Sequence, residues 1–235
     1  MSRDTVKRNV RGINLTLLAS TGPLIKFSKM DKEIEVLDFI DQIKAGEVLY
    51  DLGSCDGRFA VYAASKKILC YAFEPEQKNY GVLVKNLQLN KVGSHLKPFQ
   101  LAVGEYDHES QIIIGGAGAA GGHQRIVADA EGGRDDLKIK GQKDKIKVVS
   151  LDSAIKKHNL KKPDYLKIDI DGSELSFIKG ADSTFADKQL KKIIFELNPN
   201  DSSYNTIIKF LNKHGFIESS RYKVNQWLFN IIFSR

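Results

Sequence analysis

The sequence predicts an α/β fold in which a doubly wound, seven-strand mixed sheet ends in an antiparallel hairpin. Three observations lead to this prediction. Between residues 47 and 215, apolar strand-like runs alternate with amphipathic stretches, a rhythm typical of a parallel sheet covered by helices on both faces. The first strand runs into a glycine-containing turn, DLGSCDG at 51–57. The last stretch, GFIESSRYKVNQWLFNIIFSR, predicts two strands joined by a short turn.

The elements follow in order along the chain. Ile34, Leu37, Ile40 and Ile43 recur at helical spacing and predict a helix within 31–46. Further helices are expected at 58–66, 76–90, 153–158, 173–181 and 202–215. Strands of the sheet are expected at 47–52, 68–75, 95–104, 145–152, 163–171 and 191–199, with a peripheral strand at 111–116.

Two segments are less regular. Residues 1–30 mix basic and apolar residues, and we assign them to an N-terminal extension that contributes to a substrate pocket, with one domain over 31–235. Residues 115–136 contain seven glycines and little periodic apolar content. A long loop inside a compact domain is more often a lid or binding element than a spacer.

Composition excludes several classes of protein. No apolar run approaches the roughly 20 residues that cross a bilayer, and no cleavage site follows the basic and apolar start of the chain. Cys55 and Cys70 lie in unlike settings and are expected to be free thiols, which favours the cytoplasm. The net charge is +7, but the lysines between 138 and 162 alternate with aliphatic residues and lack aromatic partners, which disfavours nucleic-acid binding.

The turn DLGSCDG is the first candidate site. In a doubly wound sheet, ligands bind beyond the carboxyl ends of the strands, beside the first strand. Gly53 and Gly57 let the backbone take positive φ and approach a ligand. The spacing is G-x-x-x-G, not the G-x-G-x-x-G that binds a pyrophosphate, and Asp51 and Asp56 disfavour phosphate. A cofactor without phosphates and with a positive centre fits better, and S-adenosylmethionine is such a cofactor.

The second strand adds a carboxylate. Glu74 follows this strand, 23 residues after Asp51, where an acid can accept both hydroxyls of a ribose. The alternative is that Glu74 only stabilises the start of the following helix.

DLGSCDG, FEP, LKIDIDGSE and IIFEL together resemble the successive signatures of the FkbM-type methyltransferases, a family of class I S-adenosylmethionine-dependent enzymes that mostly methylate oxygen. The resemblance covers roughly 47–215 and implies a Rossmann-like class I methyltransferase sheet, whose last strand is antiparallel. Ser54 and Cys55 replace the family's usual Ala and Asn, and Asp171 replaces its usual Glu. The acceptor implied is a small molecule with a hydroxyl group.

The resemblance also implies residue roles. Asp51, Gly53, Ser54 and Gly57 would line the methionine part of the cofactor, and Glu74 the ribose. Ala102 and Val103, ending the third strand, would flank the adenine through backbone groups. Asp169 would lie near the methionine ammonium or the acceptor.

A hydroxyl acceptor needs a base to remove its proton during attack. Asp169, Asp171 and Glu174 gather at one strand-to-helix junction, and Glu196 ends the neighbouring strand. Crowded carboxylates raise one another's pKa, which suits one of them to act as the base. His123, in the glycine-rich loop, is a further candidate base. Structural roles, at a helix N-terminus for Glu174 or in holding the backbone for Asp169, are the alternatives.

An alternative is that this site binds magnesium. Asp169, Asp171, Glu196 and Asn198 would supply oxygen ligands, but acids at strand ends also occur without metal, and we predict none. Two further functions remain open at this point: a nicotinamide-dependent oxidoreductase on a related sheet, and an RNA-binding module that uses the basic surface. The sequence leaves the acceptor and the oligomeric state open.

Overall fold

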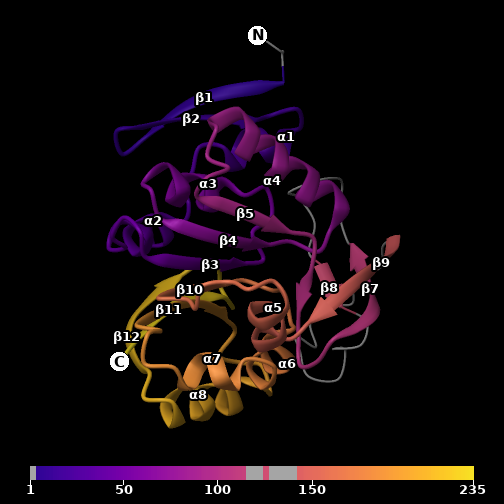
Figure 1. Cartoon of the computed structure of the whole chain (residues 1–235), viewed down its shortest axis with the longest axis vertical. Helices are drawn as coiled ribbons and strands as arrows, with labels where there is room; N and C mark the ends of the chain where they lie inside the picture. Colours follow the sequence, from indigo (N-terminus) through magenta and orange to yellow (C-terminus); the bar gives the residue numbers. More distant parts are fainter. Residues whose placement is uncertain (1–3, 115–123, 127–141) are drawn as a thin grey trace.

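The main sheet has the predicted seven strands. The computed structural model describes residues 4–114, 124–126 and 142–235 (Figure 1). The strand order is β12-β13-β11-β10-β3-β4-β5. Neighbours from β11 to β5 are parallel, whereas β13 runs antiparallel to both β11 and β12. The fold class and the terminal hairpin are therefore confirmed. The strands are β3 (Val48–Leu52), β4 (Leu69–Phe73), β5 (Leu96–Phe99), β10 (Tyr165–Ile168), β11 (Lys192–Leu197), β12 (Ile217–Lys223) and β13 (Phe229–Ser234).

Helices cover both faces of this sheet (Figure 1). Side chains of β3 alternate between two apolar clusters, with Leu49 in one and Tyr50 in the other, because successive strand residues point to opposite faces. The first cluster includes residues of α2 (Ile34–Asp41), α3 (Arg58–Ser65) and α4 (Gln77–Asn90). The second includes residues of α5 (Leu151–Lys157), α6 (Glu174–Lys179), α7 (Asp182–Ala186) and α8 (Tyr204–Lys213).

The predicted third strand is split between two sheets. Its first half is β5 in the main sheet, but Ala102 and Val103 form β6 (Ala102–Val103), which pairs with β9 (Gln142–Val149). The four-stranded second sheet has the order β6-β9-β7-β8, with β7 (His108–Ile114) and β8 (Gln124–Ile126). The strand predicted from KIKVV thus lies outside the main sheet. The sequence does not show the break, because buried apolar residues such as Phe99 and Ala102 lie on both sides of it.

Residues near the N-terminus form a hairpin that packs on α4. β1 (Thr5–Val10) pairs with β2 (Ile13–Leu18), and α1 (Gly22–Phe27) follows. Leu15 and Leu17 are buried in the same apolar cluster as α2 and α3. The Asn86 side chain of α4 accepts a hydrogen bond from the Leu18 N–H at 2.8 Å. Figure 1 shows the hairpin on the side of α3 and α4 that faces away from the main sheet.

Two other predictions concern the chain as a whole. Cys55 and Cys70 are free cysteines. Within the ranges that the structure describes, no helix has both the length and the apolar character needed to cross a bilayer.

Candidate active site

The turn after β3 is tied to the end of β4. The N–H groups of Gly53 and Ser54 both donate to the Phe73 carbonyl, each at 3.0 Å. The Ser54 hydroxyl donates to the same oxygen at 3.2 Å. These three bonds hold the turn at the carboxyl end of the sheet, where the sequence placed it.

Both glycines of the turn are required by neighbouring parts of the protein. Gly53 has φ +76° and Gly57 φ +74°, in the left-handed region that favours glycine. A Cβ on Gly53 would lie 1.7 Å from the carbonyl oxygen of Asp169, and one on Gly57 would lie 2.2 Å from Cδ1 of Leu83. Close packing against β10 and α4 is thus a reason for these glycines that the sequence did not reveal.

A buried lysine connects the ends of β3 and β10. Lys167 lies opposite Asp51 in the parallel register, and its Nζ is 3.0 Å from Asp51 Oδ1 and 3.8 Å from Asp169 Oδ2. Nζ also donates to the Gly53 carbonyl at 3.3 Å. Asp51 is 1% exposed, so its carboxylate serves the ion pair. Sequence reasoning missed Lys167; the signal was a charge inside an apolar strand.

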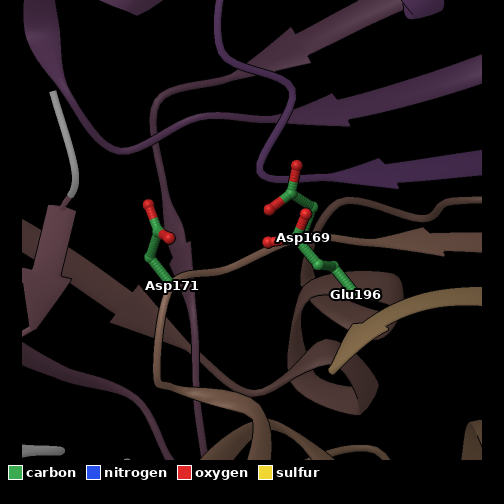
Figure 2. A group of neighbouring side chains, drawn as sticks. All are labelled: Asp169, Asp171 and Glu196. Atoms are coloured by element: carbon green, nitrogen blue, oxygen red, sulfur yellow. The ribbon is translucent and has the colours of Figure 1, made fainter. Parts of the chain in front are cut away.

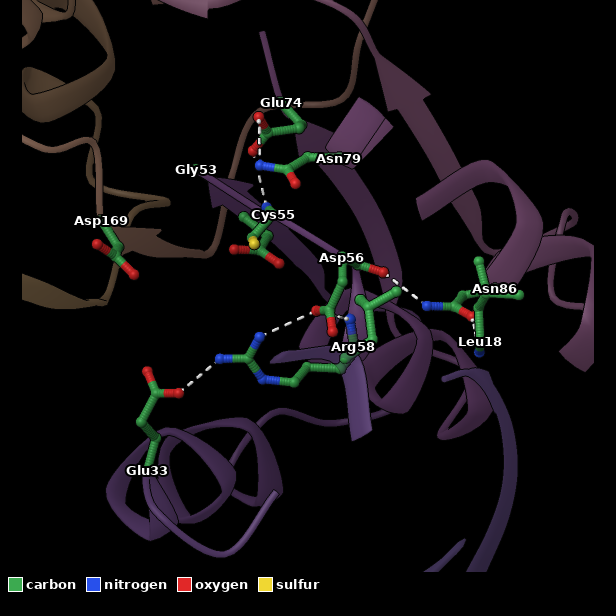
Figure 3. A network of polar contacts seen from close by, with 12 residues as sticks. Leu18, Glu33, Gly53, Cys55, Asp56, Arg58, Glu74, Asn79, Asn86 and Asp169 are labelled. Atoms are coloured by element: carbon green, nitrogen blue, oxygen red, sulfur yellow. Dashed lines mark hydrogen bonds and ion pairs between the residues drawn. The ribbon is translucent and has the colours of Figure 1, made fainter. Parts of the chain in front are cut away.

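Glu74 is buried under the turn. Its Oε2 accepts from the Cys55 N–H at 2.8 Å, and its Oε1 accepts from the Glu76 N–H at 3.0 Å. Asn79 approaches the same carboxylate, with its Nδ2 3.5 Å from Oε1 (Figure 3). The orientation of Glu74 is therefore fixed by the backbone of the turn and by the start of α4.

The second acid of the turn is also paired. Asp56 Oδ1 is 3.0 Å from Nη1 of Arg58, whose Nη2 is 2.6 Å from Glu33 Oε2. The guanidinium lies over the rings of Phe27 and Phe59, with its carbon 4.7 Å from each centroid. Figure 3 shows this network beside the turn. Asp51 and Asp56 each face a buried cation, so the argument that their charge repels phosphate no longer holds. The absence of the third glycine of the G-x-G-x-x-G pattern still disfavours a pyrophosphate.

Three carboxylates meet at the carboxyl ends of β10 and β11. One oxygen each of Asp169, Asp171 and Glu196 lies within 4.8 Å of the others (Figure 2). Asp171 has φ +44°, and its turn is held by the Gly172 N–H, which donates to Glu174 Oε1 at 2.9 Å. The structure thus brings three of the predicted catalytic acids together, and gives Glu174 a role in the turn.

The carboxyl group of Asp169 has a raised pKa. Burial raises its pKa most, nearby Lys167 lowers it, and Asp171 raises it again, giving a pKa of about 6 against an ordinary 3.8. Its side chain is still 33% exposed, so a ligand can reach it. A carboxylate with a pKa near 6 can accept a proton from a hydroxyl group near neutral pH.

The group could also bind a divalent cation, since it offers three carboxylate oxygens. Asn198, the fourth ligand considered from sequence, bonds within its own turn: Nδ2 donates to Asp201 Oδ1 at 3.2 Å, and Oδ1 accepts from the Asn200 N–H at 3.0 Å. The absence of a metal stays a prediction.

The remaining predicted residues lie elsewhere. Ala102 and Val103 are buried in β6 of the second sheet, and do not end the third strand of the main sheet. His123 lies outside the described residues.

Comparison with known proteins gives the family and the fold. The family model described as "Methyltransferase FkbM domain" matches residues 51–218. None of the curated protein sequences compared with this chain matches it.

Similar solved structures share the fold at low sequence identity. Fibrillarin from Aeropyrum pernix, solved with natively bound S-adenosyl-L-methionine, has a TM-score of 0.53 at 10% identity, over 99% of this chain and 84% of that one. Precorrin-6y C5,15-methyltransferase from Geobacter metallireducens has a TM-score of 0.51 at 12% identity, over 88% of each chain.

Proposed function

Because the chain belongs to the FkbM methyltransferase family, we propose that it transfers a methyl group from S-adenosylmethionine to the hydroxyl group of a small molecule. The chain is a methyltransferase by family; the donor, the acceptor and the residue roles are the proposal. The observation that carries it is the close approach of Gly53 in the glycine turn to Asp169, whose carboxylate lies beside those of Asp171 and Glu196.

The turn lies next to the acids that would meet the acceptor. Gly53 packs directly against the Asp169 backbone, and Glu74 is oriented by two backbone N–H groups. Asp51, Gly53, Ser54 and Gly57 would surround the methionine part, and Glu74 would accept the ribose hydroxyls. When bound, the donor supplies a methyl group on a positively charged sulfur.

The carboxylates are suited to prepare the acceptor. Asp169, with its pKa raised to about 6, would take the hydroxyl proton as the oxygen attacks. Glu196 and Asp171 would hold the acceptor in line, since alignment and exclusion of water are the main tasks in such a displacement. The positive charge of Lys167 favours the ionised form of Asp169, which is the form that accepts a proton.

Calorimetry with S-adenosylhomocysteine and NAD in parallel tests the donor. We expect S-adenosylhomocysteine to bind and NAD not to bind. Glu74→Gln should weaken S-adenosylhomocysteine about 10- to 100-fold, since a hydrogen bond to a charged group contributes about 1.5–3 kcal/mol. Glu109→Gln, on β7 of the second sheet, is the matched control and should change nothing. Binding of NAD alone would contradict the proposal.

Chelation tests the metal-free prediction. Once an acceptor is turned over, activity should survive EDTA, because Asp169 itself removes the proton. Loss of activity that Mg²⁺ restores would instead assign Asp169, Asp171 and Glu196 to a bound cation.

A further inference from the structure

Glu33, the residue directly before α2, lies near the carboxylate edge of the main sheet. Two residues further on, Glu35 Oε1 accepts from the Asn230 side chain at 2.7 Å, and Asn230 lies opposite Glu196 in the sheet. The start of α2 is therefore beside the strand that carries Glu196. The Glu33 side chain makes no capping bond to its own helix, and it has a different partner.

Arg58 joins the Glu33 carboxylate to the glycine turn. Its Nη2 donates to Glu33 Oε2 at 2.6 Å, and its Nη1 donates to Asp56 Oδ1 at 3.0 Å. The guanidinium also lies over the rings of Phe27 and Phe59. Because a planar guanidinium holds its partners in a defined geometry, the Glu33 carboxylate is fixed beside the turn.

One oxygen of this carboxylate is left for a ligand. Oε2 takes the bond from Arg58, whereas Oε1 has no hydrogen bond to another residue that the structure describes. The Glu33 side chain is 21% exposed. Asp51 and Asp56 are only 1% and 3% exposed, so a ligand at the turn reaches Glu33 more easily than either acid of the turn itself.

Glu33 also acts electrostatically on Asp169. Burial raises the pKa of Asp169 most and Lys167 lowers it, while Asp171 and Glu33 both raise it. Figure 3 shows the side chains of Glu33 and Asp169 on the same side of the turn. A cation bound near two carboxylates that repel each other is attracted by both. The methionine part of the donor carries such a cation, its ammonium group.

We propose that Glu33, held by Arg58, binds the ammonium group of the donor's methionine part. This inference rests on the proposed function. Glu33 precedes residues 51–218, which the family model matches, so the family match does not assign it. The sequence left Asp169 near either the methionine ammonium or the acceptor. With Glu33 at the ammonium, Asp169 faces the acceptor.

Two probes isolate the ammonium group: S-adenosylhomocysteine, and its desamino analogue, which keeps the carboxylate but lacks the amino group. Calorimetry with the full chain measures the first, and competition against it measures the second. The unmodified protein should bind S-adenosylhomocysteine about tenfold more tightly than the analogue, since a hydrogen bond between charged groups is lost with the amino group.

Glu33→Gln keeps the size of the side chain and removes its charge. We expect this variant to weaken S-adenosylhomocysteine about tenfold and to leave the affinity for the desamino analogue unchanged, because the analogue has no group for Glu33 to bind. Asp38→Asn is the matched control. It removes a carboxylate from the same helix, at a residue paired with Arg11, and should change neither affinity.

Three results would overturn the inference. The first is an unmodified protein that binds both probes equally well. The second is Glu33→Gln that binds S-adenosylhomocysteine like the unmodified protein. The third is Glu33→Gln that weakens both probes by the same factor, because Glu33 would then only support the turn. An unmodified protein that does not bind S-adenosylhomocysteine would instead contradict the proposed function, and this result needs no variant.

Discussion

Replacing Lys167 with methionine would remove the one ammonium group that the structure places between Asp51 and Asp169, while keeping a long apolar side chain in the strand. Lys167 is 5% exposed and Asp51 is 1% exposed. The variant would therefore leave a buried carboxylate next to an apolar neighbour, with little access to water.

The expected loss can be worked out from the two distances. At an effective dielectric constant of about 20, unit charges 3.0 Å apart attract by about 5.5 kcal/mol, and charges 3.8 Å apart by about 4.4 kcal/mol. Desolvation of the lysine offsets part of this attraction. Removing one partner of a buried pair costs about 3–5 kcal/mol, a large share of a typical folding stability of about 5–15 kcal/mol.

Urea unfolding at pH 7.5 measures this loss. We expect Lys167→Met to lower the free energy of unfolding by about 3–5 kcal/mol. The double variant Asp51→Asn with Lys167→Met should regain more than half of the loss, because both members of the pair are then neutral. The double variant also remains measurable if the single variant does not fold.

Two results would refute this reasoning. A loss below about 1 kcal/mol in Lys167→Met would mean that the carboxylate of Asp51 is not stabilised by the ammonium. A double variant as unstable as the sum of the two single variants would mean that the residues act independently. In either case the ion pair would not hold the ends of β3 and β10 together.

Four further predictions follow from the structure. Gly53→Ala should lower the free energy of unfolding by about 3 kcal/mol or more, because its Cβ would overlap the Asp169 carbonyl. The control Gly46→Ala, at φ +86° in open space, should lower it by about 1–2 kcal/mol in the same thermal scan. Methyl transfer should fall about tenfold between its plateau and pH 5, one unit below the pKa of Asp169 of about 6. Because this pKa is raised in the folded protein, the ionised carboxylate lowers the free energy of unfolding above pH 6 and has no effect below pH 3.8. Asp169→Asn should therefore be inactive, more stable than the unmodified protein by about 1–2 kcal/mol at pH 7.5, and as stable as the unmodified protein at pH 3.5. A variant as stable as the unmodified protein at both pH values would contradict the raised pKa. Asn86→Ala should cost about 2–4 kcal/mol and speed hydrogen exchange at the Leu18 N–H, since the side chain bonds both Leu18 and the Asp56 carbonyl; unchanged exchange would contradict the contact.

Local patterns predicted the sheet and the glycine turn because their signals are continuous in the sequence. The strand VLYDL is buried throughout, and the break after it is marked by two glycines whose φ angles are positive. The carboxylates could be grouped because parallel strands end at the same edge of a sheet.

Pairings between distant segments were beyond the sequence. Lys167 lies within an apolar run of the sequence, and only the register with β3 shows that it faces Asp51. The sequence predicts Ala102 and Val103 at the end of a main-sheet strand because nothing in it marks the change of sheet between Phe99 and Ala102.

The contact between the first hairpin and α4 has a practical consequence for protein engineering. Asn86 holds the Leu18 N–H with its oxygen and the Asp56 carbonyl with its nitrogen, so one amide joins the hairpin to the turn that would hold the donor. A shortened protein that starts at residue 31 would uncover apolar neighbours of Leu15 and Leu17 and would leave that amide half satisfied. Replacing the first thirty residues with those of a relative would therefore require matching changes in the residues of α4 that contact the hairpin.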